Sequence, residues 1–325
     1  MAKIIGNLAP EDDYLHELGP EPNFNESAYY NFFDKQQQLG GWFRIGNRAN
    51  EGSAERTVCL YLSDGRVLFS FGRPKIANND AFDAAGLRFE VIEPAQRHRT
   101  TFEGSVTELA EPRAMADPKA AFEGNPRKQI RFDLLHEAVG PLYGHKAEKP
   151  ANEDAEQSFA RAHFEQHMRV TGSLEIDGER LAIDGFGLRD HSWGPRYWQA
   201  IHSYEWLTLN FGADLGAMVS IIQRDAAGEQ RTAGGVLVRG MQMERLVDAK
   251  IDAEYEDNGL YHKRLTARVT TEQGQALTIT GEVKSFIPLR NRRGDRVTHI
   301  GEGMTEWKLG ERTGHGLSEF LRQLK

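Results

Sequence analysis

The chain has 325 residues, 39% of them hydrophobic, which is enough to build the core of one large or two medium globular domains. A formal net charge of -8 gives no general attraction to nucleic acid or to an anionic membrane surface, so we expect neither as a partner. Cys59 is the single cysteine, which excludes an intrachain disulfide and a zinc site built on several thiolates.

At the amino end, residues 1–14 contain acidic side chains and lack an apolar run of signal-peptide length. No later segment approaches the roughly eighteen consecutive apolar residues of a membrane-spanning helix. We therefore expect a soluble, non-secreted, cytoplasmic protein without an integral membrane segment. The single cysteine suits that reducing compartment.

Most of the chain has the pattern of short β-strands. Asp64-Gly65 and Asp177-Gly178 are turn signals between β-rich segments, as in hairpins. The predicted strands are 41–45, 57–62, 66–71, 87–92, 100–107, 129–134, 170–176, 180–183, 205–211, 217–223, 235–239, 265–271, 276–286 and 297–309.

Helices are predicted at 26–38, 152–165 and 317–324, and residues 140–154 have the composition of an exposed connection. Many strands with few helices between them favour successive antiparallel pairing in a barrel or sandwich. The predicted fold class is therefore mostly β. A basic run, Arg290, Arg292, Arg293 and Arg296, is expected to be a solvated loop rather than an anion site.

Several common sites are not supported by the sequence. His163 and His167 would share a face of a helix, but their order is not that of a zinc protease and a third ligand cannot be placed. We expect surface or interface histidines and no metal. The run Gly185-Phe-Gly lacks the third glycine of a dinucleotide fingerprint, and the chain has no P-loop or nucleophile-elbow signature. We expect no cofactor.

Residues 185–198 form the segment densest in chemistry and read Gly-Phe-Gly-Leu-Arg-Asp-His-Ser-Trp-Gly-Pro-Arg-Tyr-Trp. Asp190 and His191 would point to opposite faces of a regular strand, yet from a turn both would reach one cavity. In a functional interpretation either residue is a proton donor or acceptor among aromatic rings. In a structural interpretation Asp190 caps a turn, the neighbouring arginines pair with it, and Trp193 and Trp198 fill a barrel mouth.

A second cluster lies near the carboxyl end, where Glu302 and Glu306 would share one face of a strand and Thr305 the other. We favour exposed strand charges for this segment. His315 is a candidate site residue because its flanking glycines allow a ligand to come close.

The segment 185–196, together with Gly303-Met-Thr-Glu-Trp and the run from Thr313 to Phe320, resembles a bacterial superfamily of tandem lipocalin-like proteins related to hydroxyneurosporene synthase (carotenoid hydratase). The resemblance implies two lipocalin-like antiparallel β-barrel or sandwich domains with few short helices, which we place at 1–195 and 196–325. It also implies an apolar cavity and non-redox chemistry on greasy substrates. The motif positions that it singles out are Asp190, His191, Trp193 and Arg196.

The resulting hypothesis is a cofactor-independent hydratase, lyase or isomerase acting on a hydrophobic isoprenoid, steroid or prenylated substrate. Asp190 and His191 are the expected catalytic residues, because alkene hydration needs an acid, a held water and aromatic faces that stabilise a cation. Alternatives are a non-catalytic carrier of a lipophilic molecule and, less favoured, a structural protein that uses the motif as a subunit contact. The expected substrate-binding residues are Trp193, Arg196, Tyr197, Trp198, Trp206 and His315.

Overall fold

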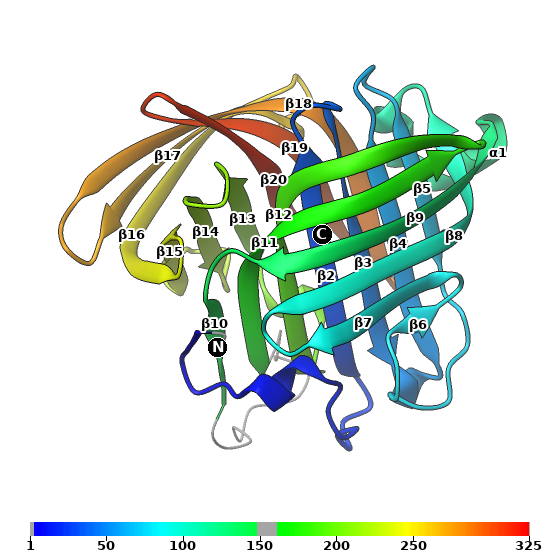
Figure 1. The fold of residues 1–325 in the computed structure, drawn as a ribbon, viewed down its shortest axis with the longest axis horizontal. Coiled ribbons are helices and arrows are strands. Elements are labelled where there is room, and N and C mark those ends of the chain that lie inside the picture. Colours follow the sequence, from blue (N-terminus) through cyan, green and yellow to red (C-terminus); the bar gives the residue numbers. More distant parts are fainter. Residues whose placement is uncertain (1–2, 148–160, 325) are drawn as a thin grey trace. The chain divides into compact units, whose positions relative to one another are not determined.

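The computed structural model describes residues 3–147 and 161–324. The described residues form two compact units (Figure 1). Unit 1 contains 3–62, 68–108, 126–147 and 161–197, and unit 2 contains 63–67, 109–125 and 198–324. The division into domains 1–195 and 196–325 that the sequence suggests stays a prediction.

Unit 1 is built on one antiparallel sheet, apart from the short β1, which pairs in parallel with β10. β9 pairs with both β8 and β11, so β11, β12, β2, β3, β4, β5, β8 and β9 form a closed circuit of paired strands. The strands are β1 (Ile4–Ile5), β2 (Phe24–Asp34), β3 (Leu39–Arg48), β4 (Ser53–Tyr61), β5 (Val67–Gly72), β6 (Asp83–Ala84), β7 (Leu87–Glu93), β8 (Arg97–Leu109), β9 (Arg127–Ala138), β10 (Leu142–Lys146), β11 (Ala162–Ile176) and β12 (Glu179–Pro195).

The core of unit 1 lies on one face of this sheet. Alternate residues of β2 point into it, among them Ala28, Tyr30 and Phe32. The intervening residues of β2 lie on the opposite face, yet they are buried as well. Short 3-10 helices occur at η1 (Pro10–Asp13) and η2 (Ala49–Glu51).

Unit 2 contains a closed antiparallel barrel in the strand order of the sequence. Its core includes Leu207, Val219 and Trp307. The strands are β13 (Ser203–Asn210), β14 (Gly216–Gln223), β15 (Arg231–Arg239), β16 (Gln242–Tyr255), β17 (His262–Thr271), β18 (Ala276–Arg293), β19 (Arg296–Leu309) and β20 (Arg312–Gln323). The helices of this unit are η3 (Pro112–Ala116), α1 (Pro118–Gly124) and η5 (Trp198–Ala200).

The predicted mostly β class of lipocalin-like domains is confirmed, and so are both hairpins. The helices predicted at 26–38 and 317–324 are wrong, because these residues belong to β2 and β20. Both strands are buried on both faces, and such strands lack the polar alternation that marks a half-buried strand. Of the helix predicted at 152–165, residues 152–160 lie outside the described residues and 162–165 belong to β11.

The basic run predicted as a loop lies instead on the hairpin of β18 and β19, where Arg290, Arg292 and Arg296 are exposed. Among the described residues, no helix has the length and apolar character needed to cross a membrane.

Candidate functional site

Residues 185–195 of the segment 185–198 form the second half of β12, which pairs with β11 on one side and β2 on the other. Because this part of β12 is a paired strand and not a turn, Asp190 and His191 face opposite sides of the sheet. His191 faces the core of unit 1. Asp190 faces the opposite side, which we call the polar face and define by Tyr143, His163, Glu165 and Asp190.

On the core side, His191 belongs to a hydrogen-bond network centred on Glu26. Oε1 of Glu26 lies 2.9 Å from Nε2 of His191 and 2.7 Å from Nδ1 of His16. Its Oε2 accepts hydrogen bonds from the backbone N–H of His16 at 3.0 Å and from Nδ2 of Asn79 at 2.5 Å. The Glu26 side chain is fully buried. Burial raises its pKa, but the hydrogen bonds from His16 and His191 outweigh this and lower the pKa to about 2.

Aromatic rings enclose the same network. The Trp193 indole stacks on His16 with 3.8 Å between ring centroids. Phe82, Phe164 and Trp193 contact the His191 ring edge-on. Trp193 therefore lies on the core side with His191 and not on the side of Asp190. These ring contacts and the hydrogen bond to Glu26 fix the orientation of the His191 ring.

Arg189, the residue before Asp190, forms a buried ion pair that sequence reasoning missed. Its guanidinium donates to Asp13 at 2.5 and 3.1 Å and to Oε1 of Gln166 at 2.8 and 3.0 Å. Burial raises the pKa of Asp13, but the charges of Arg189 and His98 outweigh it and hold the pKa well below its usual range. Arg189 thus ties η1 to β11 and β12.

On the polar face, cross-strand pairing aligns Tyr143, Glu165, Asp190 and Tyr29 in one row over β10, β11, β12 and β2. His163 lies two residues before Glu165 on β11, opposite Ser192, and hydrogen-bonds Oδ2 of Asp190. Nε2 of His163 also lies 3.7 Å from Oε1 of Glu165. The side chains of His163 and Asp190 are 34% and 18% exposed, so they are the accessible members of this cluster, whereas Glu165 is buried.

The two partners keep each other charged. Burial lowers the pKa of His163, but the charge and hydrogen bond of Asp190 outweigh it and raise the pKa to about 9. Burial raises the pKa of Asp190, and the charge and hydrogen bond of His163 outweigh it, so that the pKa is lowered. At neutral pH this is an imidazolium and carboxylate pair beside a second carboxyl group.

Arg196 is the other motif residue next to this cluster. It donates to Oγ of Ser192 at 2.8 Å, and Ser192 lies 3.2 Å from Oγ of Ser27. Burial and the nearby charge of Arg44 lower the pKa of Arg196 to about 10, and the charge of Arg196 helps to lower that of Asp190. Tyr197 is the last residue of unit 1.

The remaining predicted substrate-binding residues, Trp198, Trp206 and His315, belong to unit 2. His315 is paired across the strands with Asn210, and its Nε2 lies 3.7 Å from Oε2 of Glu306. Trp206 is paired with Glu319 instead. Trp206 and His315 therefore lie four residues apart along β13 and β20 rather than side by side.

The expectation of exposed strand charges in the second cluster is wrong for Glu302. Glu302 is 3% exposed, and its burial raises its pKa to about 8. It lies opposite Glu319, and Thr305 faces the barrel core, where it contacts Oγ of Ser318 at 2.7 Å. The strand does therefore place Glu302 and Thr305 on opposite faces, as the sequence predicts.

Two trios of side chains have ligand atoms within 4.8 Å of one another and are candidate metal-binding groups: His16, Glu26 and His191, and His163, Glu165 and Asp190. In the first trio, hydrogen bonds already occupy the carboxylate. The second trio places Glu165 and Asp190 beside His163, and the sequence alone could not identify these two partners. In the second trio the His163 cation balances one negative charge, that of Asp190.

Sequence reasoning missed His16, Glu26, Glu165 and Tyr143. A period of two over His163, Glu165 and His167 was the available signal, because alternate residues of a strand share a face. The helical interpretation of this segment concealed it.

Comparison with solved structures supports the fold. An AttH-assigned protein from Nitrosomonas europaea matches over 98% of both chains with a TM-score of 0.65 and 15% identity. Kievitone hydratase from Nectria haematococca matches over 99% of this chain and 96% of its own, with a TM-score of 0.57 and 11% identity. CghA matches over 92% of this chain and 88% of its own, with a TM-score of 0.55 and 13% identity.

At these identities the likeness concerns the fold, and it confirms the predicted resemblance to the carotenoid hydratase and lipocalin-like architecture. A comparison with curated proteins finds no match. The family comparison matches residues 9–324, nearly the whole chain. The chain therefore belongs to the family described as domain of unknown function DUF7064.

Proposed function

We propose that this protein is an enzyme of the hydratase type, a cofactor-independent hydratase, lyase or isomerase acting on a hydrophobic isoprenoid, steroid or prenylated substrate. The observation that carries the proposal is the partly exposed His163 and Asp190 pair beside Glu165. The fold shared with kievitone hydratase supports it. A carrier of a neutral lipophile gains nothing from such a pair, since desolvating charges costs several kcal/mol.

In this proposal His163 is the proton donor, because it carries a proton at neutral pH. Its proton passes to an alkene carbon and leaves a tertiary cation, or passes to a leaving hydroxyl in the reverse direction. The carboxylates of Asp190 and Glu165 stabilise the positive charge that develops in the transition state. In hydration, Asp190 then accepts a proton from the water that attacks the cation.

The proposal changes the roles expected from the sequence. Asp190 acts with His163 and not with His191, since His191 lies on the other face of β12. The cation-stabilising rings are those of Tyr143 and Tyr29, which share the row of Asp190. Arg196 stays a candidate substrate-binding residue on the same side.

The test follows oxygen from isotopically heavy water into products formed from a panel of isoprenoid alkenes and alcohols, with detection by mass spectrometry. We expect Asp190→Asn and His163→Gln to lower the rate by about a hundredfold or more. Asp184→Asn is the matched control, because Asp184 lies on the same strand, is 59% exposed and pairs with Arg169. Its rate should equal that of the wild type.

Full activity in a folded Asp190→Asn variant would contradict the proposal. A compound that co-purifies with the protein and never changes mass or isomer would instead identify a carrier.

A further inference from the structure

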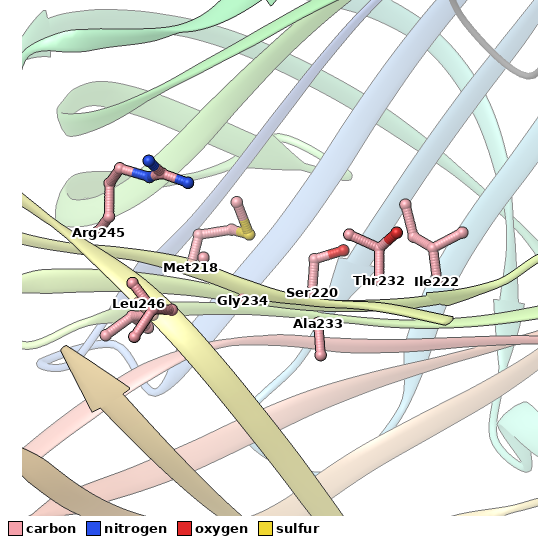
Figure 2. A pocket seen from close by; sticks show the side chains of 10 residues that line it. Met218, Ser220, Ile222, Thr232, Ala233, Gly234, Arg245 and Leu246 are labelled. Carbon is pink, nitrogen blue, oxygen red and sulfur yellow. The ribbon is translucent and has the colours of Figure 1, made fainter. Parts of the chain in front are cut away.

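A pocket of about 300 Å³ lies on the outer side of the barrel of unit 2, over β14, β15 and β16. In Figure 2 the side chains of Met218, Ser220, Ile222, Thr232 and Arg245 rise from one side of these strands. The side chains of Leu246 and Ala233 point to the other side, where they pack against the barrel core. None of these residues belongs to the polar face of unit 1.

The hollow results from a missing side chain in the middle of a cross-strand pattern. Gly234 lies opposite Ser220, between the pair of Ile222 with Thr232 and the pair of Met218 with Val236. A Cβ on Gly234 would lie 2.6 Å from the carbonyl oxygen of Leu246. The backbone of β16 therefore requires glycine at this position, and the hollow is built into the sheet.

The next residue reinforces this arrangement. Gly235 has a φ of +150°, and a Cβ there would lie 1.9 Å from the carbonyl oxygen of Met218. The two adjacent glycines thus allow β15 to approach both neighbours closely, and they fix the floor of the pocket in one shape. A preformed site of this kind loses little conformational entropy when a ligand binds.

The lining combines apolar surface with one cation. Met218, Ile222 and Val247 supply the apolar part, and Val247 is 52% exposed. Arg245 stands at one edge, in the row of Val236 and Met218. Ser220 and Thr232 add hydroxyl groups.

The guanidinium of Arg245 makes no hydrogen bond or ion pair with any residue in 3–147 or 161–324. The nearby carboxylate of Glu272 accepts from the backbone N–H of Arg245, at 3.3 Å, and not from its side chain. Two other exposed arginines of the barrel are paired: Arg239 lies 3.5 Å from Glu244, and Arg268 contacts Asp252. Arg245 is therefore a cation available to a ligand.

We propose that this pocket binds a small amphiphile with a carboxylate head, held by Arg245, and an aliphatic body that covers Met218, Ile222 and Val247. A guanidinium matches a carboxylate with two parallel hydrogen bonds. The aliphatic body removes exposed apolar surface from water. The pocket volume lies at the lower end of the range for small-molecule sites, which suits a medium-chain acid. This site goes beyond the proposed function and does not depend on it.

The experiment is calorimetric titration of the full chain with octanoate and, in parallel, with octan-1-ol at the same ionic strength. We expect octanoate to bind at one site and at least tenfold more tightly than the alcohol. Arg245→Gln should remove this preference by weakening octanoate binding at least tenfold while binding of the alcohol is unchanged. Arg268→Gln, which removes an exposed arginine that does not line the pocket, should bind octanoate like the wild type.

A second variant tests the place of the aliphatic body. Ser220→Phe adds a ring to the pocket, and it should weaken both ligands, provided that thermal unfolding shows a folded protein. Equal affinity for acid and alcohol, wild-type affinity in Arg245→Gln, or no binding of either compound would each overturn the proposal.

Discussion

At the scale of single residues, Glu26 is a decisive polar group of unit 1. Its buried carboxylate joins His191 of β12, His16 of the amino-terminal segment and Asn79 of the loop before β6. Removing one member of such a network leaves the other buried polar groups without their partner, which costs about 1–3 kcal/mol or more.

The first prediction concerns the pH dependence of this contribution. The pKa of Glu26 is about 2 in the folded protein, below its ordinary value of 4.5, so its ionised form stabilises the fold above pH 4.5. That stabilisation is lost as the pH falls from 4.5 towards 2. We expect Glu26→Gln to lower the free energy of unfolding at pH 7 by a few kcal/mol.

Denaturant titrations of both proteins at several pH values check this. The difference between them should shrink as the pH falls through that window. A difference that stays constant from pH 7 to 3 would show that the carboxylate is not ionised through these contacts.

The sequence pointed to β12 as the chemical centre, and in the structure Asp190 contacts His163 and His191 contacts Glu26. The sequence could not identify the partners of these two residues. Glu26 and His163 lie far from Asp190 and His191 in the chain, and only the registers of β2 and β11 against β12 bring them together. A shift by one residue would exchange the two faces. The Asp177-Gly178 turn sets the register of β11 against β12, but no turn connects β2 to β12.

At the scale of elements, the pairing of β12 with β2 depends on glycine. A Cβ on Gly187 would lie 1.7 Å from the carbonyl oxygen of Asn31, and Oδ1 of Asn31 accepts a hydrogen bond from the backbone N–H of Leu188 at 2.8 Å. The glycines of the motif therefore serve close strand approach rather than binding of a phosphate.

We predict that Gly187→Ala destabilises the protein by about 2 kcal/mol or more, because the added methyl group separates the two strands. Gly124→Ala is the matched control, since a Cβ at Gly124 meets no atom within 4 Å. Its effect should stay within about 0.5 kcal/mol. Equal unfolding free energies for the two variants, measured by denaturant titration, would contradict the close approach.

Strands with an alternating pattern and a turn signal could be predicted from the sequence, as β11 and β12 illustrate. The sequence did not reveal that β2 and β20 are strands. Tyr29 and Tyr30 are both buried although they face opposite sides of the sheet, so the strand has no polar side to reveal its period.

At the scale of the whole molecule, a segment from the first half of the chain completes unit 2. Residues 109–125 carry η3 and α1 and contact β18. Met115 is buried, and Nε of Arg113 donates to Oε1 of Glu256 at 3.0 Å.

We therefore expect the fragment 198–325 to be incomplete on its own. Its melting temperature should rise when a peptide of residues 109–125 is added, because Met115 and its neighbours then bury apolar surface. The same peptide with Met115→Asp is the control and should raise the melting temperature less. Identical melting curves with and without the peptide would show that the barrel is self-sufficient.

The pairing of β2 with β12 also has a consequence for protein synthesis. β2 ends at residue 34, and β12 begins at residue 179, so a ribosome releases β2 long before its partner exists. During that interval the nascent chain carries an aromatic strand with an open edge, which invites pairing with other chains. Translation that stops before residue 195 should therefore yield aggregating products and make the growing chain a client of chaperones.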